Sequence, residues 1–490
     1  MTQVALQVDK ATAGAINLHI IDGVAGSRLI VAPTGPLDRD QDDVRCLFDA
    51  ACSGVARAKA AGAIAPIIVA DPSLEAAGFE NVQAVLLLGA LFAQYSTLQN
   101  REFSGEAKAQ PVRKLAVLPL PSAAADIADI IKRVRATEAG RRVARDICGA
   151  DPARMTNLNA YEYVKGALGH LPNITITAVT DLPEMEKDYP CAYAVGRASE
   201  LNPKHYPVIM RVEYTPPADV QEQVYFAGKG ITYDTGGADV KAGGIMAGMK
   251  RDCGGAAAAA GFMRTVGELQ PANLRVVAYL GFVRNDIGPT MYVGDEIIVS
   301  HAGKRVLVVN TDAEGRMVMC DLLSHIREEV LAAKQDAKLA AARTTVHSIA
   351  TLTGHAVVAV GKYSICLDNG VSKMLGVSPR LVAAGDSIAD PFETSTMRRD
   401  DFAMVAPKRD DHDVVQCNAL PSSRTPRGHQ FPAVFMYLAS GLVDHGPSNT
   451  ETPIAYTHLD IAGSAAFGDS AGGVETGNPV CALVEAYIPK

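Results

Sequence analysis

Short runs of β-branched and apolar residues alternate with longer helical patterns along most of the chain. Runs of the first kind cover residues 64–70, 208–214 and 275–282. Residues 43–60 and 315–331 instead carry apolar side chains at helical spacing. Strands that alternate with helices build α/β folds, in which helices cover the faces of a sheet. The pattern therefore predicts the α/β fold class, with a largely parallel sheet in the first 150 residues.

The chain is long enough for more than one hydrophobic core. It has 490 residues, of which 48% are hydrophobic, and domains usually contain about 100–200 residues. A charged helical segment at 127–148 runs into the turn-forming stretch GADPARMTN. We therefore predict a smaller N-terminal α/β domain at 1–155 and a larger C-terminal α/β domain at 156–490. The charged, proline-containing segment 390–432 is interpreted as a surface or interface loop.

Charge and hydropathy argue against two classes of partner. The formal net charge of -8 disfavours binding to nucleic acid or to an anionic membrane, because both need a cationic face. The longest apolar stretch, residues 85–93, is far shorter than the roughly 20 residues of a transmembrane helix. The N-terminus has no signal-like apolar core, and the nine cysteines form no CxxC pair. A cytoplasmic protein with reduced thiols is expected.

The stretch NTDAEGR, residues 310–316, lies between an apolar strand pattern and a helix. Its two carboxylates, Asp312 and Glu314, are two residues apart and can converge on one point. Converging carboxylates repel each other unless a cation is present. The alternative interpretation is that they are acids at a helix N-terminus, where the helix dipole favours them.

A second segment, VYFAGKGITYDTGGADVKAGG at 224–244, follows another apolar strand pattern. It contains Lys229, Asp234 and Lys241 among six glycines that permit close backbone approach. The GxxxxGK[ST] pattern of a phosphate-binding loop is missing. A solvated glycine-rich loop remains the alternative. The stretch MKRDCGG then adds Asp252.

These residues favour a metal centre dominated by carboxylates. None of the eleven histidines is followed by glutamate, so the zinc motif HExxH is absent. Bridging carboxylates can hold two divalent ions about 3.5–4 Å apart. More than one metal ion is therefore expected.

Several motifs together resemble those of the leucyl aminopeptidase family of dinuclear-metal peptidases. They are NTDAEGR, GKGITYDTGG, MKRD and IATLTG (349–354), and THLDIAG (457–463) is similar to a further family motif. They occur in order over residues 220–465. The resemblance implies that the N-terminal 155 residues form a macro-like α/β domain, and that the C-terminal catalytic domain has a mixed central sheet.

The resemblance also implies two divalent metal ions per subunit. Lys229, Asp234, Asp252 and Glu314 would bind the more tightly held ion. Asp234, Asp312 and Glu314 would surround the more exchangeable one, so that Asp234 and Glu314 bridge. Zinc is the first expectation, and manganese, cobalt or magnesium are alternatives.

Catalytic and substrate-binding roles follow from the same resemblance. Lys241 would polarise the scissile carbonyl, and Arg316 would hold a bicarbonate or a water that acts as general base. Residues expected to line the substrate cleft are Met249, Asn310, Thr351, Leu352 and Gly354. For Met249 and Leu352, core packing is an equal alternative. His355 stands where the family usually has a small residue, so it either contacts substrate or caps the turn.

The implied protein is a metal-dependent aminopeptidase. It would remove N-terminal, leucine-like apolar residues from peptides with a free N-terminus, and it would assemble as a homohexamer. One alternative is a catalytically weak oligomeric scaffold or a nucleic-acid-binding member of the same fold. Another is a different dinuclear hydrolase, such as a phosphoesterase.

Overall fold

The computed structural model describes residues 7, 9–470 and 472–490. Residue contacts divide the chain into two compact units. The N-terminal unit consists of Met1–Glu138 and Ala384–Asp390, and the C-terminal unit consists of Ala139–Ala383 and Pro391–Lys490. The division falls inside helix α6 (Ile127–Gly149), whereas the boundary predicted from the sequence lies in the segment after that helix.

The strands of the N-terminal unit form two separate pairs. β1 pairs antiparallel with β2, and β3 pairs parallel with β4. The prediction of one largely parallel sheet is therefore wrong for the described part of this unit. A connection as short as residues 21–27 suits an antiparallel hairpin, because a parallel crossover needs about a dozen residues or more. The elements of this unit are β1 (Asn17–Ile20), β2 (Arg28–Val31), α2 (Arg45–Ala60), β3 (Ile67–Val69), α3 (Val82–Phe92), α4 (Leu98–Ser104), α5 (Glu106–Ala109) and β4 (Ala116–Leu118).

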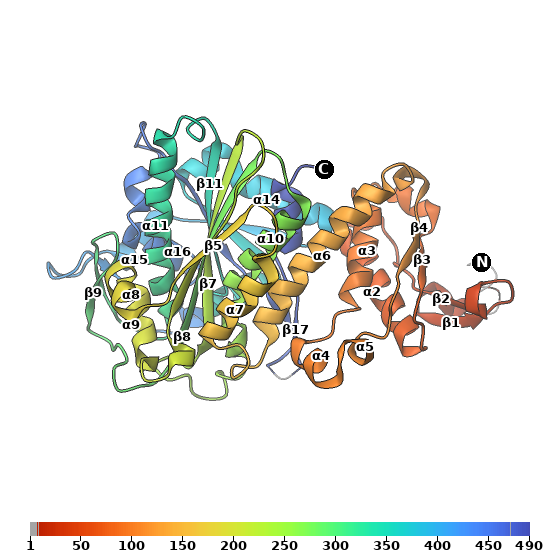
Figure 1. The fold of residues 1–490 in the computed structure, drawn as a ribbon, viewed down its shortest axis with the longest axis horizontal. Coiled ribbons are helices and arrows are strands. Elements are labelled where there is room, and N and C mark those ends of the chain that lie inside the picture. The colour runs from red at the N-terminus through yellow and green to blue at the C-terminus, as the bar shows by residue number, and fades with distance from the viewer. Residues whose placement is uncertain (1–6, 8, 471) are drawn as a thin grey trace. The chain divides into compact units, whose positions relative to one another are not determined.

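The C-terminal unit contains most of the strands and helices (Figure 1). Its strands are β5 (Ile174–Val179), β6 (Val208–Tyr214), β7 (Glu222–Asp234), β8 (Leu274–Asn285), β9 (Ile297–Val299), β10 (Arg305–Leu307), β11 (Arg343–Ala350), β12 (Ser364–Asp368), β13 (Phe392–Thr396), β14 (Val414–Val415), β15 (Ala455–Asp460), β16 (Ala466–Phe467) and β17 (Val474–Glu475). Its helices after α6 are α7 (Asn157–Leu168), α8 (Leu182–Asp188), α9 (Pro190–Gly196), α10 (Gly254–Leu269), α11 (Glu314–Gln335), α12 (Gly354–Val360), α13 (Gly370–Leu375), most of α14 (Val377–Ile388), α15 (Arg399–Val405), α16 (Gln430–Ala439) and α17 (Val480–Tyr487). Among the described residues, no helix combines the length and apolarity needed to cross a bilayer.

An eight-stranded sheet forms the centre of the C-terminal unit. Its strand order is β13-β12-β15-β11-β7-β8-β6-β5. The middle strands β15, β11, β7 and β8 run parallel, whereas β6 and β5 add antiparallel pairs at one edge. The predicted mixed central sheet is therefore confirmed.

Helices cover both faces of this sheet. On one face, Tyr225 of β7 belongs to a buried cluster with Val318 and Leu322 of α11. On the other face, Phe226 contacts Phe262 of α10 edge-to-face, with ring centroids 5.3 Å apart. Successive residues of one strand thus face different helices, as expected for a parallel sheet buried on both sides.

Glycines at the start of α10 let this helix approach the sheet closely. A Cβ atom on Gly255 would lie 1.9 Å from the carbonyl oxygen of Ile349 on β11. A Cβ on Gly228 of β7 would lie 2.7 Å from the Cα of Ala256. The small residues therefore allow backbone-to-backbone packing here, which brings the residues before α10 against the ends of β7 and β11.

The segment 390–432 contains regular structure, so its interpretation as a loop is wrong. It forms β13 at the edge of the central sheet, helix α15, strand β14 and the start of α16. Part of its charge is paired within the protein: Arg427 Nη2 donates to Asp401 Oδ2 at 2.8 Å, and Asp401 is fully buried. High charge content indicates exposure only when the charged groups lack such partners.

Candidate metal centre

The predicted site residues gather at the carboxyl ends of the parallel strands. β7 ends at Asp234, which is in register with Asn285 at the end of β8. β11 and β15 end next to each other at Ala350 and Asp460. Ligands of α/β sheets bind beyond the carboxyl ends of the strands. The geometry of the sheet therefore places this edge where a site is expected.

Lys229 is buried within β7 and points between two acids. Its Nζ lies 2.8 Å from Asp252 Oδ1 and 2.9 Å from Glu314 Oε1, and it donates to the carbonyl oxygen of Thr351 at 3.2 Å. A Cβ on Gly315 would lie 2.2 Å from Lys229 Cε. Glycine at this position of α11 therefore makes room for the lysine side chain.

Asp234 and Lys241 form the other half of the cluster. Asp234 Oδ1 accepts hydrogen bonds from the Gly236 amide at 2.9 Å and from Asn285 Nδ2 at 2.8 Å. Its Oδ2 lies 2.8 Å from Lys241 Nζ, which also forms an ion pair with Asp312. Lys241 thus links the end of β7 to the turn that precedes α11.

All five predicted metal ligands lie in this one cluster. Ligand oxygens of Asp234, Asp312 and Glu314 lie within 4.8 Å of one another. Asp252 joins them through Lys229, which contacts both Asp252 and Glu314. We refer to the four acids with Lys229 and Lys241 as the acidic centre.

Three carboxylate oxygens of the acidic centre are buried without a hydrogen-bond partner: Asp252 Oδ2, Asp312 Oδ1 and Glu314 Oε2. Asp312 Oδ1 forms the ion pair with Lys241, whereas the other two oxygens have no such ion pair. The other oxygen of Asp252 is well supplied, because it accepts from Thr351 Oγ1 at 2.9 Å and contacts Lys229. An unpartnered buried carboxylate oxygen is costly unless a cation completes its coordination.

The charges of the acidic centre perturb one another. Burial, reinforced by Glu314, raises the pKa of Asp234 to about 7, and burial also raises the pKa of Asp252. Burial opposes the charge of Lys229 and of Lys241, but the neighbouring carboxylates outweigh it and raise the pKa of both. The four carboxyl groups of the acidic centre therefore carry more negative charge than its two lysines neutralise.

The donor set of this cluster fits divalent cations. Carboxylate oxygens bind Mg²⁺, Mn²⁺ and Zn²⁺, and a neutral amine can add a nitrogen ligand. The unpartnered oxygens of Asp252 and Glu314 provide unused acceptor positions. A bound dication would also favour the charged forms of Asp234 and Asp252, against the burial and the repulsion by neighbouring carboxylates that raise their pKa.

Arg316 lies in the first turn of α11 and is buried. Its Nη1 donates to the carbonyl oxygen of Gln416 at 3.1 Å, and its guanidinium stacks over Phe431 at 5.1 Å from the ring centroid. Its Nε has no hydrogen-bond partner. Burial lowers the pKa of Arg316 from its usual value. A buried cation with an unused donor can anchor a small anion.

The residues predicted to bind substrate occupy different positions around the centre. Thr351 contacts it directly through Asp252 and Lys229, and Asn310 Oδ1 accepts from the Asp312 amide at 2.8 Å. The other three are neighbours in sequence of Asp252 or Thr351. Met249 begins the turn that carries Asp252, and Leu352, partly buried, packs against the buried cluster around α11. The Gly354 amide donates to Ser422 Oγ at 3.0 Å.

The sequence interpretation missed residues that hold the ligands in place. Asn285 Nδ2 bridges Asp234 and the carbonyl oxygen of Thr311. Asp239 Oδ2 accepts from the Thr311 amide at 2.8 Å, and Asp460 accepts from the Leu352 amide and from Thr353 Oγ1. Asn285 and Asp460 each end a parallel strand. Polar residues at that position were the available signal.

His355 forms a pair with a second histidine. Its Nδ1 lies 2.7 Å from Nδ1 of His429. The N-terminus of α12 is capped by another residue, since Thr353 Oγ1 accepts from the Ala356 amide at 3.1 Å. Burial lowers the pKa of His355, and burial together with His355 lowers that of His429 to about 4.

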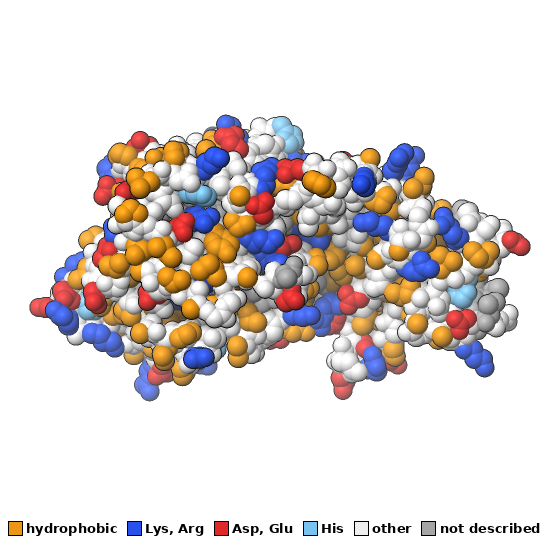
Figure 2. Space-filling view, turned by 90° about the horizontal axis from the view of Figure 1, so that it is seen from below, with side chains coloured by type: hydrophobic (Ala, Val, Ile, Leu, Met, Phe, Trp, Pro, Cys, Tyr) orange, Lys and Arg blue, Asp and Glu red, His pale blue; other side chains and the backbone are white. Residues whose placement is uncertain are grey.

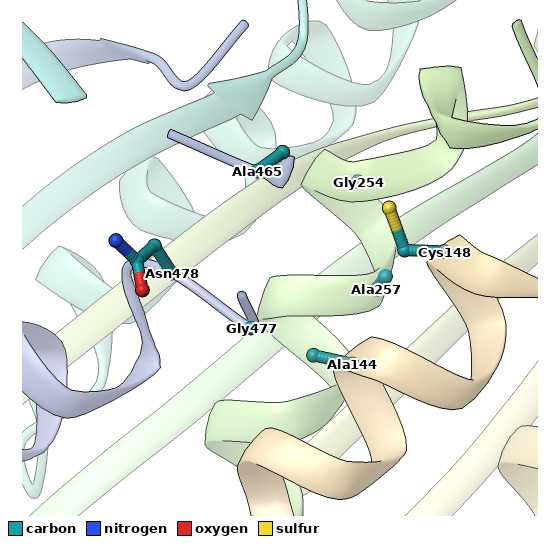
Figure 3. Close-up of a pocket in the computed structure, with 7 residues that line it drawn as sticks. All are labelled: Ala144, Cys148, Gly254, Ala257, Ala465, Gly477 and Asn478. Atoms are coloured by element: carbon teal, nitrogen blue, oxygen red, sulfur yellow. The ribbon is translucent and has the colours of Figure 1, made fainter. Parts of the chain in front are cut away.

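A small cavity lies next to the start of α10 (Figure 3). Its lining comes from α6, from the start of α10 and from the C-terminal segment, and consists mostly of small side chains: Ala144, Cys148, Gly254, Ala257, Ala465, Gly477 and Asn478. Figure 3 shows the Cys148 thiol pointing towards Gly254. The cavity shares no residue with the acidic centre, so we regard it as a packing gap.

Comparison with known sequences identifies relatives of this chain. Residues 142–484 match the model of the cytosol aminopeptidase family, catalytic domain. A putative aminopeptidase of Caenorhabditis elegans is 38% identical over 465 residues, which cover 95% of this chain and 85% of that protein. A probable cytosol aminopeptidase of Tropheryma whipplei is 30% identical over 340 residues, or 69% of this chain and 61% of that protein.

Solved structures share the fold. The bottromycin maturation enzyme BotP in complex with Mn has a TM-score of 0.77 at 20% identity, with coverage of 99% of this chain and 95% of that one. Leucyl aminopeptidase from Trypanosoma brucei in complex with actinonin also has a TM-score of 0.77, at 22% identity, with coverage of 99% and 87%. Together with the family match, these similarities show that the chain belongs to the cytosol aminopeptidase family of metallo-exopeptidases.

Proposed function

We propose that this enzyme removes apolar, leucine-like residues from the free N-terminus of peptides, using two divalent metal ions held by the acidic centre. One observation carries the proposal: Asp234, Asp252, Asp312 and Glu314 are gathered around two lysines, with buried carboxylate oxygens left unpartnered. Membership in the cytosol aminopeptidase family supports the reaction type.

The proposed ligands divide into two overlapping sets. Lys229, Asp234, Asp252 and Glu314 would hold the tighter ion, and Asp234, Asp312 and Glu314 the more exchangeable one. Lys229 must lose its proton to serve as a ligand. The carboxylates Asp252 and Glu314 favour its charged form, so this role requires that bound cations first neutralise those acids.

When bound, the metal ions would supply Lewis-acid chemistry for water activation and a coordination position for an uncharged amine. The protein contributes the remaining groups. Lys241 would donate to the carbonyl oxygen on which negative charge develops, and its long side chain already reaches Asp234 and Asp312. Arg316 would hold a bicarbonate or a water near the scissile bond through its unpartnered Nε.

The preference for an apolar N-terminal residue rests on the expected cleft wall. Met249 and Leu352 would offer flexible apolar surface, which suits a leucine-like side chain. Thr351 and Asn310 would fix the wall to the acidic centre through their contacts with Asp252 and Asp312. Gly354 would keep the adjoining turn free of a side chain.

A chelation and reconstitution assay tests the proposal. Leu-p-nitroanilide and Leu-amide hydrolysis would be measured after dialysis against chelator, and again after addition of Zn²⁺, Mn²⁺, Co²⁺ or Mg²⁺. We expect activity to disappear and then return with at least one metal. N-acetyl-Leu-p-nitroanilide is the matched control and should not be hydrolysed. Full activity without metal, or equal hydrolysis of the acetylated substrate, would refute the mechanism.

We also propose a homohexamer in solution. The family resemblance supports this assembly, and exposed apolar side chains such as Val358 on α12 and Leu420 offer surface for subunit contacts. Sedimentation equilibrium provides the measurement. A species at the 51.6 kDa mass of one chain would contradict the assembly without affecting the proposed chemistry.

Nucleic-acid binding, one of the alternatives, has weaker support than the proposed aminopeptidase activity. On the face of the molecule in Figure 2, Lys and Arg side chains are interspersed with acidic and apolar ones. The net charge of -8 also disfavours nucleic-acid binding, because nucleic-acid affinity depends on a concentrated cationic surface. The presence of all the proposed ligands together with Lys241 and Arg316 also favours an active enzyme over a scaffold.

A further inference from the structure

A second group of metal-ligating side chains lies on the surface of the C-terminal unit. His301 lies in the turn between β9 and β10, and His325 and Glu328 lie three residues apart on one side of α11. Each of the three offers a ligand atom within 4.8 Å of the other two. None of them belongs to the acidic centre. Along α11, His325 is about 16 Å from Glu314 at the usual rise per residue.

Hydrogen bonds leave one nitrogen of each imidazole available. His325 Nε2 lies 2.7 Å from the carbonyl oxygen of Asp188. Because a carbonyl can only accept, Nε2 carries the proton and Nδ1 keeps its lone pair. His301 Nδ1 lies 2.9 Å from Ser324 Oγ, and in the tautomer in which Nδ1 donates, Nε2 is free. Metal-binding histidines characteristically donate their other N–H in this way.

Packing holds the ring of His325 in place. This ring stacks on Tyr189 with centroids 4.2 Å apart and on His301 with centroids 3.8 Å apart. The backbone of His301 is tied to α11, because its amide donates to Asp321 Oδ1 at 3.0 Å. The position of His325 is therefore set before any ligand binds, whereas the ring of His301 must rotate out of the stack to share an ion with it.

The charge state of the group suits a divalent cation. Burial and the neighbouring His325 lower the pKa of His301, so its ring is neutral at neutral pH, and neutral imidazole is the ligand form. Glu328 adds a negative charge and is about half exposed, which leaves a path from solvent. Its competing partner is Arg327 Nη2 at 3.4 Å, and exposed pairs of this kind are weak.

We propose that His301, His325 and Glu328 form a mononuclear site for a divalent transition metal of the Zn²⁺ class. Two imidazoles and one carboxylate are a common ligand set for Zn²⁺, with a fourth position for water. Bonds of about 2.0–2.2 Å require the ligand atoms to move closer together on binding. His301 in its turn and Glu328 at the surface can make this movement, while His325 stays fixed. The ion would join the β9–β10 turn to α11.

Copper(II) is a suitable probe because its pulsed EPR spectrum reports coordinated imidazole directly. The metal-binding residues proposed for the acidic centre include no histidine, so an imidazole signal from the full-length chain reports a different site. We expect this signal in the wild type and in Glu314→Gln, and we expect its loss in the double variant His301→Gln/His325→Gln. His170→Gln, which changes an exposed histidine elsewhere, is the matched control and should keep the signal.

Equilibrium dialysis with Zn²⁺ gives the stoichiometry. The wild type should bind one more ion per chain than the double variant. If the double variant fails to fold, as judged by circular dichroism, the single surface variants His301→Gln and Glu328→Gln replace it and should each weaken this Zn²⁺ site at least tenfold. Equal Zn²⁺ binding by wild type and variants, or an unchanged imidazole signal, would overturn the proposal. Neither readout depends on peptidase activity, so the test is independent of the proposed function.

Discussion

Two carboxylates on α11 are equally buried but differ in the partners that their oxygens have. Glu314 begins the helix, and one of its oxygens contacts Lys229 while the other has no partner. Asp321, two turns further on, accepts three backbone hydrogen bonds, from the amides of Cys191, Ala192 and His301. Both side chains are at most 1% exposed.

The difference separates a structural acid from a ligand. Asp321 is completed by donors of its own chain, so it needs nothing from outside to remain buried. Glu314 lies beside Asp234 and Asp312 and keeps an unused oxygen, which an external cation can satisfy. The number of hydrogen bonds that a buried carboxylate accepts is therefore more informative than its burial. The following variants test this distinction.

The largest effect is expected for Glu314→Gln. The amide keeps the shape of the side chain but removes the charge that would bind both ions, so turnover of Leu-p-nitroanilide should fall by on the order of 10³-fold, more than the loss usual for residues that only support ligands. Metal content, measured by elemental analysis, should fall as well. Glu268→Gln on α10, where Glu268 pairs with Arg264 at the surface, is the control. A Glu314→Gln enzyme with normal metal content would remove Glu314 from the ligand set.

Lys241→Ala should reduce turnover by about 10²-fold, the usual cost of losing a donor to a developing oxyanion. Because Lys241 is proposed to act on substrate, the loss should fall on kcat, and the metal content should be retained. Steady-state kinetics with parallel metal analysis provide the measurement. Lys165→Ala, at an exposed position on α7, is the matched control. Wild-type turnover in the Lys241 variant would exclude this catalytic role.

Asp321→Asn should act on stability. An amide can accept from the donors on one side only, and its NH₂ group would then face the remaining backbone N–H. The expected loss is about 1–3 kcal/mol of unfolding free energy. The midpoint of denaturant unfolding measures this change, and metal content at the acidic centre should stay at the wild-type level. Loss of that metal would show that the two carboxylates on α11 are not as different as their contacts indicate.

The smallest effect concerns His347, whose buried Nδ1 also lacks a partner but belongs to a neutral ring. Burial lowers its pKa from 6.5 to about 3. Below about pH 6.5 the unfolded chain binds a proton at this histidine, whereas the folded chain does not. The free energy of unfolding therefore decreases as the pH falls from about 6.5 towards 3.

His347→Gln should weaken this pH dependence. Between pH 6.5 and 5.5 the wild type should lose up to about 1.4 kcal/mol through this group, and the variant should not. Thermal midpoints at pH 7 and 5.5 give the comparison. The exposed His170→Gln serves as control, and an identical acid sensitivity of wild type and His347→Gln would show that His347 is not held neutral by burial.

Much of the acidic centre could be predicted because its parts are local in sequence. Asp312 and Glu314 lie in one strand-to-helix turn, and Lys229 and Asp234 lie in one strand. Their chemical type and their place at the ends of apolar runs point to a site at the carboxyl edge of a sheet. The family motifs then relate these separate turns to one another.

Other features depend on long-range contacts and had no local signal. The segment 390–432 was interpreted as a loop because its charges suggested exposure to solvent, but it forms strands and helices, and its fully buried Asp401 pairs with Arg427. Asn285 becomes a partner of Asp234 only because β8 lies next to β7 in register.

The sequence alone determined the α/β class, the family and the residue types of the acidic centre, because periodicity and short motifs are properties of neighbouring residues. Only the tertiary structure decided which buried polar atoms have partners and which do not. It also brought His301 to His325, a pairing that a search for HExxH does not detect. The physical reason is that hydrogen-bond satisfaction and burial depend on which distant segments pack together, and the order of strands in the central sheet sets that packing.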